Sequence, residues 1–450
     1  MPSDDLAPFD AGLLSPVTAG RDAVVSDDAV VDALVTAEVA LVRALAAEGA
    51  IDPSIAERVS GALGWQAEGD GCRGHGVSAR DLSAAAVSDG NPVIPLVAGL
   101  RDAVAAEDAP WIHRGATSQD ILDTALMIVA RSAADAIGAD LTTAADALVA
   151  FAGAHADDVA AARTLTQHAV PTTVGARAAG WERGIRRSLA RLVAARDALP
   201  AQLGGAAGTL ASFVEGFGPH VALRLPGTFA AQVGLRAPAA PWHTERWPVT
   251  ELGDALVQVT DALGKMAADV ATLSRTEIGE LAEGTGGGSS AMPQKQNPVR
   301  AVLIRSAAIR APQLGATLHF AAALAVDERP DGAWHAEWPA LRELLRVTLG
   351  AAAHAADLAR GLRVDRDAVA RNLALTGGLL VSERLRAVLV PLVGPERFAH
   401  ALAGSPETLA ERIRALPEAA HLDLDDLLDP ARYTGLAPRV ASDPDPAVGS

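Results

Sequence analysis

The sequence predicts an all-α protein with a central bundle of long helices. Hydrophobic residues make up 50% of its 450 residues but aromatic residues only 3%, so Ala, Leu and Val dominate. Such residues suit closely packed helices better than twisted sheets. Between Leu252 and Leu273 apolar residues recur at alternating steps of four and three. This spacing is typical of a long bundle helix, and no strand-like alternation persists elsewhere.

The same periodicity places the other helices. We expect one helix to begin near Ser26, another to begin near Thr117 and a third to cover residues 172–199. Another resumes after Pro298, and shorter helices follow residue 364. Because 450 residues exceed one ordinary core, we expect two or three domains, and we divide the chain into three consecutive parts. These are an N-terminal helical domain (1–108), the central bundle (109–345) and a C-terminal helical domain (346–450).

Two carboxylates interrupt apolar helix faces. Glu38 lies on the same face as Val31, Leu34 and Leu41 of the first helix. Glu277 takes the bundle-facing position that follows Leu273 in the long helix. We therefore expect Glu277 to point inward near the end of that helix, where it is a candidate site residue.

Charge and cysteine content exclude several functional classes. The formal net charge of −17 argues against binding nucleic acid or an anionic membrane. Cys72 is the only cysteine, so neither a disulfide framework nor a thiolate metal cluster is expected. The acidic N-terminus lacks the features of a signal peptide, and no apolar stretch reaches membrane-spanning length. We expect a cytoplasmic protein.

Residues 284–298 interrupt the bundle with glycines, two serines, a lysine and an asparagine before proline. Glycines let a loop fold over a ligand, and Lys295 and Asn297 can hold a carboxylate while charge builds on it. One of the two serines could remove a proton next to that carboxylate. Composition alone favours a solvated Gly/Ser linker, but the Met-Pro-x-Lys-x-Asn-Pro run is not typical of linkers. The spacing of a phosphate-binding loop is absent.

The segment 288–297, with sequence GSSAMPQKQN, resembles the signature of the fumarase/aspartase superfamily. Residues 113–120 (HRGATSQD) resemble the first carboxylate-binding region of that family, and residues 163–173 resemble the second. Residues 327–338 add a fourth match. The resemblance implies a three-domain, all-α fold and a homotetramer with sites shared between subunits. It also implies a small polycarboxylate as substrate, and neither a metal nor a cofactor is expected.

The resemblance implies a role for each matching position. Ser289 matches the general base, and Lys295 and Asn297 match the residues that bind the reacting carboxylate. The expected substrate-binding residues are His113, Arg114, Thr117, Ser118, Gln119, Ser290, Met292 and Arg329. Further candidates are His168, Arg177 and Glu277. Thr117 and Ser118 could instead only cap the helix that follows. His113 and His168 could be structural, and Arg177 and Arg329 could be solvated surface charges.

Within the superfamily, residues 115–120, 171–181, 202–210, 241–244 and 332–338 most resemble bacterial 3-carboxy-cis,cis-muconate cycloisomerases of protocatechuate catabolism. Fumarase-like members carry a histidine directly after the Arg-Thr of the second region, where this chain has Leu165. A hydroxide or amine leaving group needs a proton donor there, whereas a carboxylate leaves as a stable anion. Leu165 therefore favours the opening and closing of a lactone.

Other functions fit part of this pattern. A nitrosuccinate lyase fits Leu165 equally well, because nitrite also leaves unprotonated. Adenylosuccinate lyase fits less well, because the expected histidine is missing. A non-catalytic scaffold, such as the eye-lens crystallins related to argininosuccinate lyase, is disfavoured because Ser289, Lys295 and Asn297 are all present.

Overall fold

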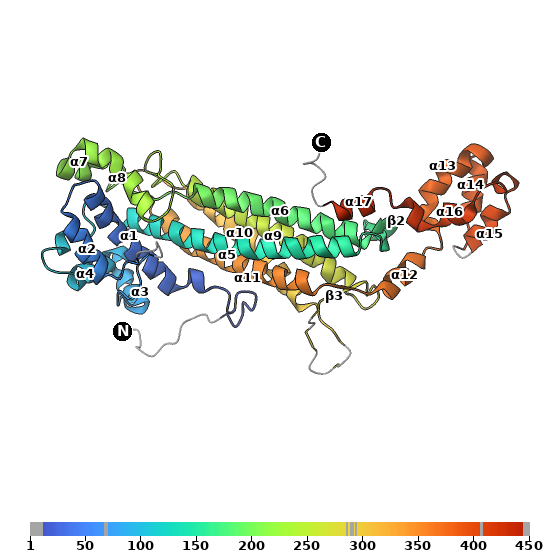
Figure 1. The fold of residues 1–450 in the computed structure, drawn as a ribbon, viewed down its shortest axis with the longest axis horizontal. Coiled ribbons are helices and arrows are strands. Elements are labelled where there is room, and N and C mark those ends of the chain that lie inside the picture. Colours follow the sequence, from blue (N-terminus) through green and yellow to red (C-terminus); the bar gives the residue numbers. More distant parts are fainter. Residues whose placement is uncertain are drawn as a thin grey trace. The chain divides into compact units, whose positions relative to one another are not determined.

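The computed structural model describes residues 12–66, 71–284, 287–288, 292, 295–405 and 408–443. Within these residues the predicted all-α fold is confirmed. The long helices are α5 (Ser118–Ala154), α6 (Val174–Ala198), α9 (Trp247–Leu273), α10 (Val299–Ala323) and α11 (Gly332–Gly361) (Figure 1). Helices α5, α6 and α10 begin close to the predicted starts near residues 117, 172 and 298.

Shorter helices precede, connect and follow the long ones. They are α1 (Asp27–Ala47), α2 (Pro53–Ala62), α3 (Ala79–Asp89), α4 (Val93–Ala103), α7 (Ala211–Phe217), α8 (Pro219–Gln232), α12 (Arg366–Ala374), α13 (Ser382–Val393), α14 (Pro395–Leu402), α15 (Leu409–Arg414), α16 (Leu424–Leu428) and α17 (Ala437–Ser442). Among the described helices, none is both long enough and apolar enough to span a bilayer.

The chain divides into two compact units that alternate along the sequence. The first comprises Met1–Ala139, Ser188–Asp261 and Ser306–Ala353, and the second comprises Asp140–Arg187, Ala262–Arg305 and His354–Ser450. Both units contain segments of the long helices. The three consecutive domains expected from the sequence stay a prediction.

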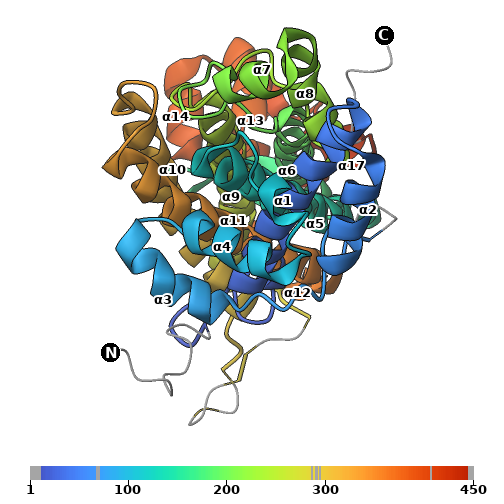
Figure 2. The ribbon, with the colours of Figure 1, turned by 90° about the vertical axis from the view of Figure 1, so that its left-hand side faces the viewer.

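In the first unit, α1 packs against α2 and α8 (Figure 2). Ser26 caps this helix by accepting a hydrogen bond from the Ala29 amide, which explains why the helix begins there. Cys72 is fully buried beside α1, where its backbone N–H donates to Thr36 Oγ1 at 2.8 Å. Burial raises the pKa of the Cys72 thiol to about 12.

The second unit contains a β-hairpin that the helical periodicity did not predict. Strand β1 (Val159–Thr164) pairs with β2 (Gln167–Thr173), and Leu165 and Thr166 form the two-residue turn between them. Two shorter strands, β3 (Leu281–Ala282) and β4 (Arg363–Val364), also pair antiparallel. The hairpin follows α5 and precedes α6, so it carries the segment expected to form the second carboxylate-binding region.

The prediction that Glu277 points inward near the end of the long helix is wrong. Helix α9 ends at Leu273, and Glu277 is exposed in the turn that follows. The bundle-facing spacing therefore stops before it reaches this carboxylate. The buried carboxylates of the segment are Glu280 and Glu283, which are only 1% and 8% exposed.

Candidate active site

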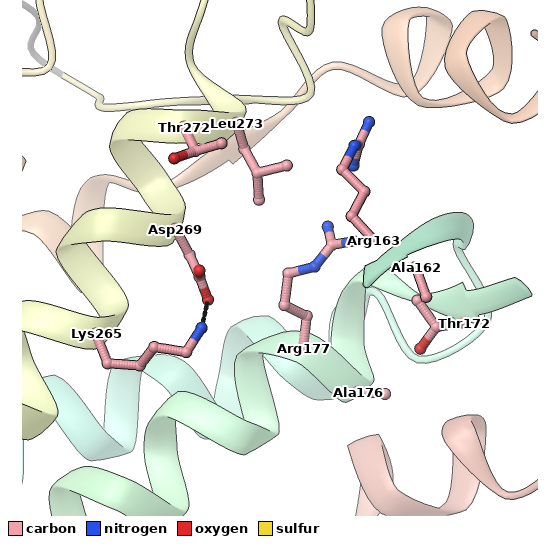
Figure 3. Close-up of a pocket in the computed structure, with 9 residues that line it drawn as sticks. All are labelled: Ala162, Arg163, Thr172, Ala176, Arg177, Lys265, Asp269, Thr272 and Leu273. Carbon is pink, nitrogen blue, oxygen red and sulfur yellow. Dashed lines mark hydrogen bonds and ion pairs between the residues drawn. The ribbon is translucent and has the colours of Figure 1, made fainter. Parts of the chain in front are cut away.

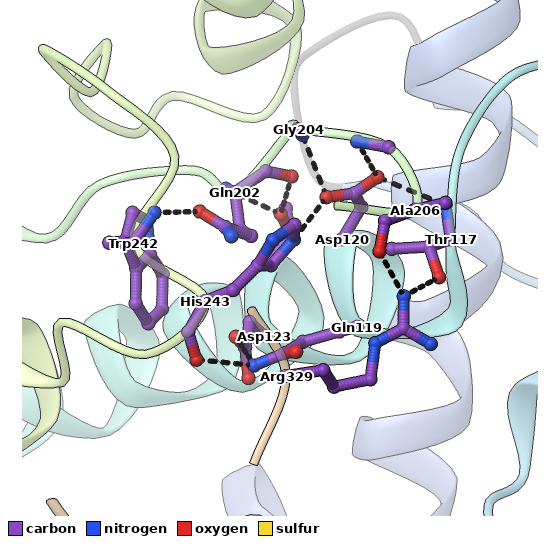
Figure 4. A network of polar contacts seen from close by, with 12 residues as sticks. Thr117, Gln119, Asp120, Asp123, Gln202, Gly204, Ala206, Trp242, His243 and Arg329 are labelled. Carbon is purple, nitrogen blue, oxygen red and sulfur yellow. Dashed lines mark hydrogen bonds and ion pairs between the residues drawn. The ribbon is translucent and has the colours of Figure 1, made fainter. Parts of the chain in front are cut away.

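The start of α5, in the first unit, brings together two of the predicted substrate-binding residues. Arg329 Nη2 donates to Thr117 Oγ1 and, at 3.2 Å, to the carbonyl of Ala206 (Figure 4). Thr117 is buried and Arg329 is exposed. Ser118 is the first residue of α5, where backbone N–H groups favour anions. This arrangement can hold one carboxylate of a substrate.

Asp120 fixes the loops around this helix start. Its buried carboxylate accepts hydrogen bonds from the backbone amides of Thr117 at 3.0 Å, Gly204 at 2.8 Å and Gly205 at 2.9 Å. His243 Nε2 lies 2.8 Å from the same carboxylate. Figure 4 shows Asp120 between the 117 and 204 loops. One buried anion thus connects the first carboxylate-binding region to a glycine-rich loop that is distant in sequence.

Gln119 makes structural contacts in addition to its predicted role. Its side chain is fully buried, and its amide nitrogen donates to the His243 carbonyl at 2.8 Å and to Asp123 at 3.2 Å. Asp123 also accepts from Arg246, which pairs in turn with buried Glu337. Burial raises the pKa of Glu337. Gln119 therefore supports the loops around the helix start, and its predicted contact with substrate stays a prediction.

His113 and Arg114 flank the helix start on the N-terminal side. His113 Nδ1 lies 2.6 Å from Glu38 Oε1, and Glu38 is fully buried on α1. This contact explains the carboxylate on the apolar face of that helix. Burial of the imidazole opposes its charged form, but the charge and hydrogen bond of Glu38 outweigh burial, so the pKa of His113 is raised. Arg114 is exposed and lies over the Trp111 ring, 6.0 Å from its centroid.

The second carboxylate-binding region is organised by Glu280, in the second unit. Arg163, on β1, donates to both carboxylate oxygens of Glu280 at 2.5 and 3.2 Å. Asn372 donates at 2.9 Å, and Arg177 Nη1 lies 3.6 Å away. Burial opposes ionisation of Glu280, but the hydrogen bonds from Arg163 and Asn372 outweigh it and lower its pKa. A register shift between Ala161 and Arg163 distorts β1, and such irregularities re-aim side chains.

A cavity of about 360 Å³ lies beside this cluster. Figure 3 shows Arg177, on α6, and Lys265 and Asp269, on α9, around the same space. Its lining residues are Ala162, Arg163, Thr172, Ala176, Arg177, Lys265, Asp269, Thr272 and Leu273. Lys265 pairs with Asp269, and Arg163 and Arg177 share Glu280, so three cations face two carboxylates beside this cavity.

His168 lies opposite Arg163 in the hairpin. Partial burial and the positive charge of Arg163 lower the pKa of His168, against the opposing effect of Glu280. Its ring is therefore mainly neutral at pH 7, and it is a poor proton donor. Leu165 projects from the turn and is 96% exposed.

In the loop after β3, Asn297 is held by backbone hydrogen bonds with Gly287, at 3.0 and 2.8 Å. Lys295 is exposed, and its amide donates to the Met292 carbonyl at 3.0 Å. Met292 is 44% exposed. Ser289 and Ser290 lie outside the described residues, so their predicted roles stay predictions.

Sequence reasoning missed the buried carboxylates that organise these regions. Asp120 lies within the recognised 113–120 segment but was given no role, while Glu280 and Glu283 were passed over in favour of Glu277. A signal was present for the last two, because acidic residues recur every third position at 277, 280 and 283. Which of the three is buried depends on where α9 ends, and the apolar spacing does not give that position.

Comparison with known proteins defines the class of the chain. Residues 22–312 match the lyase family, and the chain belongs to that family, within the fumarase/aspartase superfamily of enzymes. It is 46% identical to a nitrosuccinate lyase of Streptomyces davaonensis, over 98% of this chain and 97% of the relative. It is also 38% identical to a 3-carboxy-cis,cis-muconate cycloisomerase of Bradyrhizobium diazoefficiens, over 96% of each chain.

A solved structure agrees with this assignment. The crystal structure of the 3-carboxy-cis,cis-muconate lactonizing enzyme from Pseudomonas putida is similar with a TM-score of 0.86 and 34% identity. The similarity covers 96% of this chain and 98% of that one. The all-α fold of the fumarase/aspartase superfamily, predicted from the resemblance, is therefore confirmed.

Proposed function

We propose that this enzyme is a nitrosuccinate lyase that releases nitrite and forms fumarate. Ser289 takes the proton from the carbon next to the distal carboxylate, and Lys295 and Asn297 stabilise the negative charge that builds on that carboxylate. The electron pair then forms the carbon–carbon double bond, and the carbon–nitrogen bond breaks with its pair leaving on nitrite. The roles of Ser289, Lys295 and Asn297 rest on the family signature.

The observation that carries this choice is the 46% identity to a nitrosuccinate lyase over 98% of this chain, and the missing proton donor agrees with it. Leu165 cannot donate a proton, and the lowered pKa of His168 leaves its ring mainly neutral. Such a hairpin suits a leaving group that departs as a stable anion. Nitrite meets this requirement, whereas hydroxide and amines do not.

Two sets of predicted site residues suit the two carboxylates of nitrosuccinate. Arg329 with Thr117, and Lys295 with Asn297, are two sets of groups that suit carboxylates. Arg177, a further candidate cation, pairs with Glu280 and donates to the Ala161 carbonyl at 3.1 Å. Arg177 Nη1 is nevertheless buried without a hydrogen-bond partner, so Arg177 keeps a donor and does not separate a dicarboxylate from a tricarboxylate.

A 3-carboxy-cis,cis-muconate cycloisomerase is the second candidate. The lactone carboxylate also leaves unprotonated, so Leu165 permits this reaction too. Arg114 is exposed next to the first region and could meet a third carboxylate. The relatives with this activity cover nearly the whole chain at lower identity.

Purified enzyme incubated with nitrosuccinate should release nitrite and fumarate in equal amounts. Nitrite is measured by diazo coupling and fumarate by ultraviolet absorbance. Carboxymuconate and adenylosuccinate are tested in parallel. Turnover of carboxymuconate without release of nitrite from nitrosuccinate would contradict the proposal and favour the cycloisomerase.

Ser289→Ala should abolish turnover while leaving substrate binding intact, because the base is lost but the carboxylate ligands remain. Binding is measured as the rise in melting temperature with added substrate. Retained turnover would contradict the assignment of Ser289 as the base.

A further inference from the structure

The first turn of α10 lacks a side-chain cap of its own. The helix begins at Val299, and the Pro298 carbonyl accepts the first helical hydrogen bond, from the Val302 amide at 3.0 Å. Pro298 therefore takes the N-cap position, but its side chain has no hydrogen-bond acceptor. The amides that follow need a partner from elsewhere in the protein.

Glu283 supplies this partner from the other end of the loop. Its carboxylate accepts hydrogen bonds from the amide of Arg300 at 3.1 Å and from that of Ala301 at 2.8 Å. Glu283 is only 8% exposed. A buried negative charge at the positive end of a 25-residue helix is also electrostatically favourable.

The backbone around Glu283 is itself anchored. The preceding residues form β3, which pairs with β4. Gly284 lies so close to the end of α11 that an added Cβ would be 2.6 Å from the Gly361 carbonyl oxygen. The glycine at position 284 is therefore needed for close packing, whereas the sequence suggested that it gives the loop freedom to move.

Contacts on both sides hold the backbone at Asn297. Its backbone pairs with Gly287 on one side, and α10, which Glu283 caps, begins two residues later. At Gly287 an added Cβ would be 2.2 Å from Val299 Cγ2, so the paired segments are tightly packed. The orientation of Asn297, and of Lys295 two residues before it, depends on these contacts at the two ends of the loop.

We infer that Glu283 is a positioning residue, which holds the base of the 284–298 loop so that Lys295 and Asn297 meet the reacting carboxylate. This inference rests on the roles given to Lys295 and Asn297 in the proposed function. Misplacement of catalytic groups by about 1 Å can reduce the rate roughly 100-fold. Loss of Glu283 should therefore act on kcat rather than on folding.

The test compares Glu283→Ala with Glu283→Gln. The alanine variant should lose about 10- to 100-fold in kcat with little change in KM. Glutamine keeps one acceptor oxygen for the first-turn amides, so it should recover most of kcat. Asp423→Ala is the matched control, because it removes the cap of α16, where Asp423 accepts from the Asp426 amide at 3.1 Å. This control should keep the kcat of the unmodified enzyme.

Hydrogen exchange gives a readout that needs no substrate. The amides of Arg300 and Ala301 should exchange faster in Glu283→Ala than in the unmodified enzyme, while amides in the middle of α10 stay protected. Unchanged exchange of these two amides, or an unchanged kcat in Glu283→Ala, would overturn the inference.

Failure of the proposed function gives a different result. An enzyme that acts on carboxymuconate but releases no nitrite would overturn the proposed substrate, and the kcat comparison would then use carboxymuconate. If neither compound is turned over, the hydrogen-exchange rates of the Arg300 and Ala301 amides alone decide whether Glu283 holds the end of the loop where α10 begins.

Discussion

Asp120 and Glu283 are buried carboxylates that accept hydrogen bonds from backbone amides of distant segments. Asp120 binds amides of the 117 and 204 loops, and Glu283 binds the first turn of α10. A hydrogen bond to a charged acceptor is stronger than one between neutral groups. Both side chains therefore fix backbone that carries predicted substrate-binding residues, although neither needs to touch the substrate.

The His113–Glu38 pair predicts a pH dependence of stability. The pKa of His113 is raised above its ordinary value of 6.5 by Glu38, against the effect of burial. The pair therefore contributes fully below pH 6.5, and its contribution is lost as the pH rises through the raised pKa. The free energy of unfolding should fall in Glu38→Gln by about 1.5 to 3 kcal/mol at acidic pH and by less at alkaline pH.

Urea unfolding followed by circular dichroism, over a series of pH values, checks this prediction. His75→Gln is a suitable control, since His75 pairs with partly exposed Asp32 on another part of α1. A destabilisation by Glu38→Gln that stayed constant with pH would contradict the assigned protonation of His113.

For single residues, the sequence predicts those that match a family motif. It does not predict the residues that hold the motif in place. Thr117 and Arg329 were expected in the site, and the structure brings them into contact. The supporting roles of His243 and Glu280 arise from contacts across 123 and 117 residues. Such contacts depend on packing between distant segments, and no local spacing encodes them.

Among the elements, the β1–β2 hairpin has an unusual turn. Leu165 and Thr166 have φ values of 49° and 73°, as in a type I′ turn. Asn-Gly is the preferred sequence for such a turn, and other L-residues are strained there. The hairpin was not predicted because its strands lack apolar alternation, whereas α9 was predicted because its apolar spacing persists over 247–273.

Replacing the turn with Leu165→Asn and Thr166→Gly should raise the free energy of unfolding by about 1 kcal/mol or more. The gain arises because the new residues adopt positive φ with less strain. Thermal and urea unfolding measure it. Leu375→Asn is the control, because Leu375 is 67% exposed but has an ordinary φ of −53° and should give no gain. An equal gain in both variants would show that strain in the turn is not the cause.

For the whole molecule, we propose a homotetramer with active sites shared between subunits, as the family resemblance implies. Helix α10 exposes Val302, Ile309 and Phe320, which are 52%, 73% and 69% exposed. Their spacings of seven and eleven residues place them on one face of the helix. An apolar face of this kind suits contact with a second copy of the chain.

Shared sites predict complementation between inactive variants. Ser289→Ala and Thr117→Val should each be inactive alone, but tetramers refolded from an equal mixture should regain part of the activity. The gain arises because some mixed sites combine an intact Thr117 with an intact Ser289. Activity and light scattering are measured together. Phe320→Glu should weaken assembly, and a fully active monomer would contradict the proposal.

The burial of Cys72 leaves the folded chain without a readily reactive thiol, because this is the only cysteine and its pKa is about 12. Alkylating reagents attack the thiolate, which is scarce at neutral pH for such a group. One cysteine introduced at an exposed position would therefore accept a fluorescent or spin label selectively, with the native sequence otherwise unchanged. Pairs of such labels would allow the distance between the two compact units to be measured in solution.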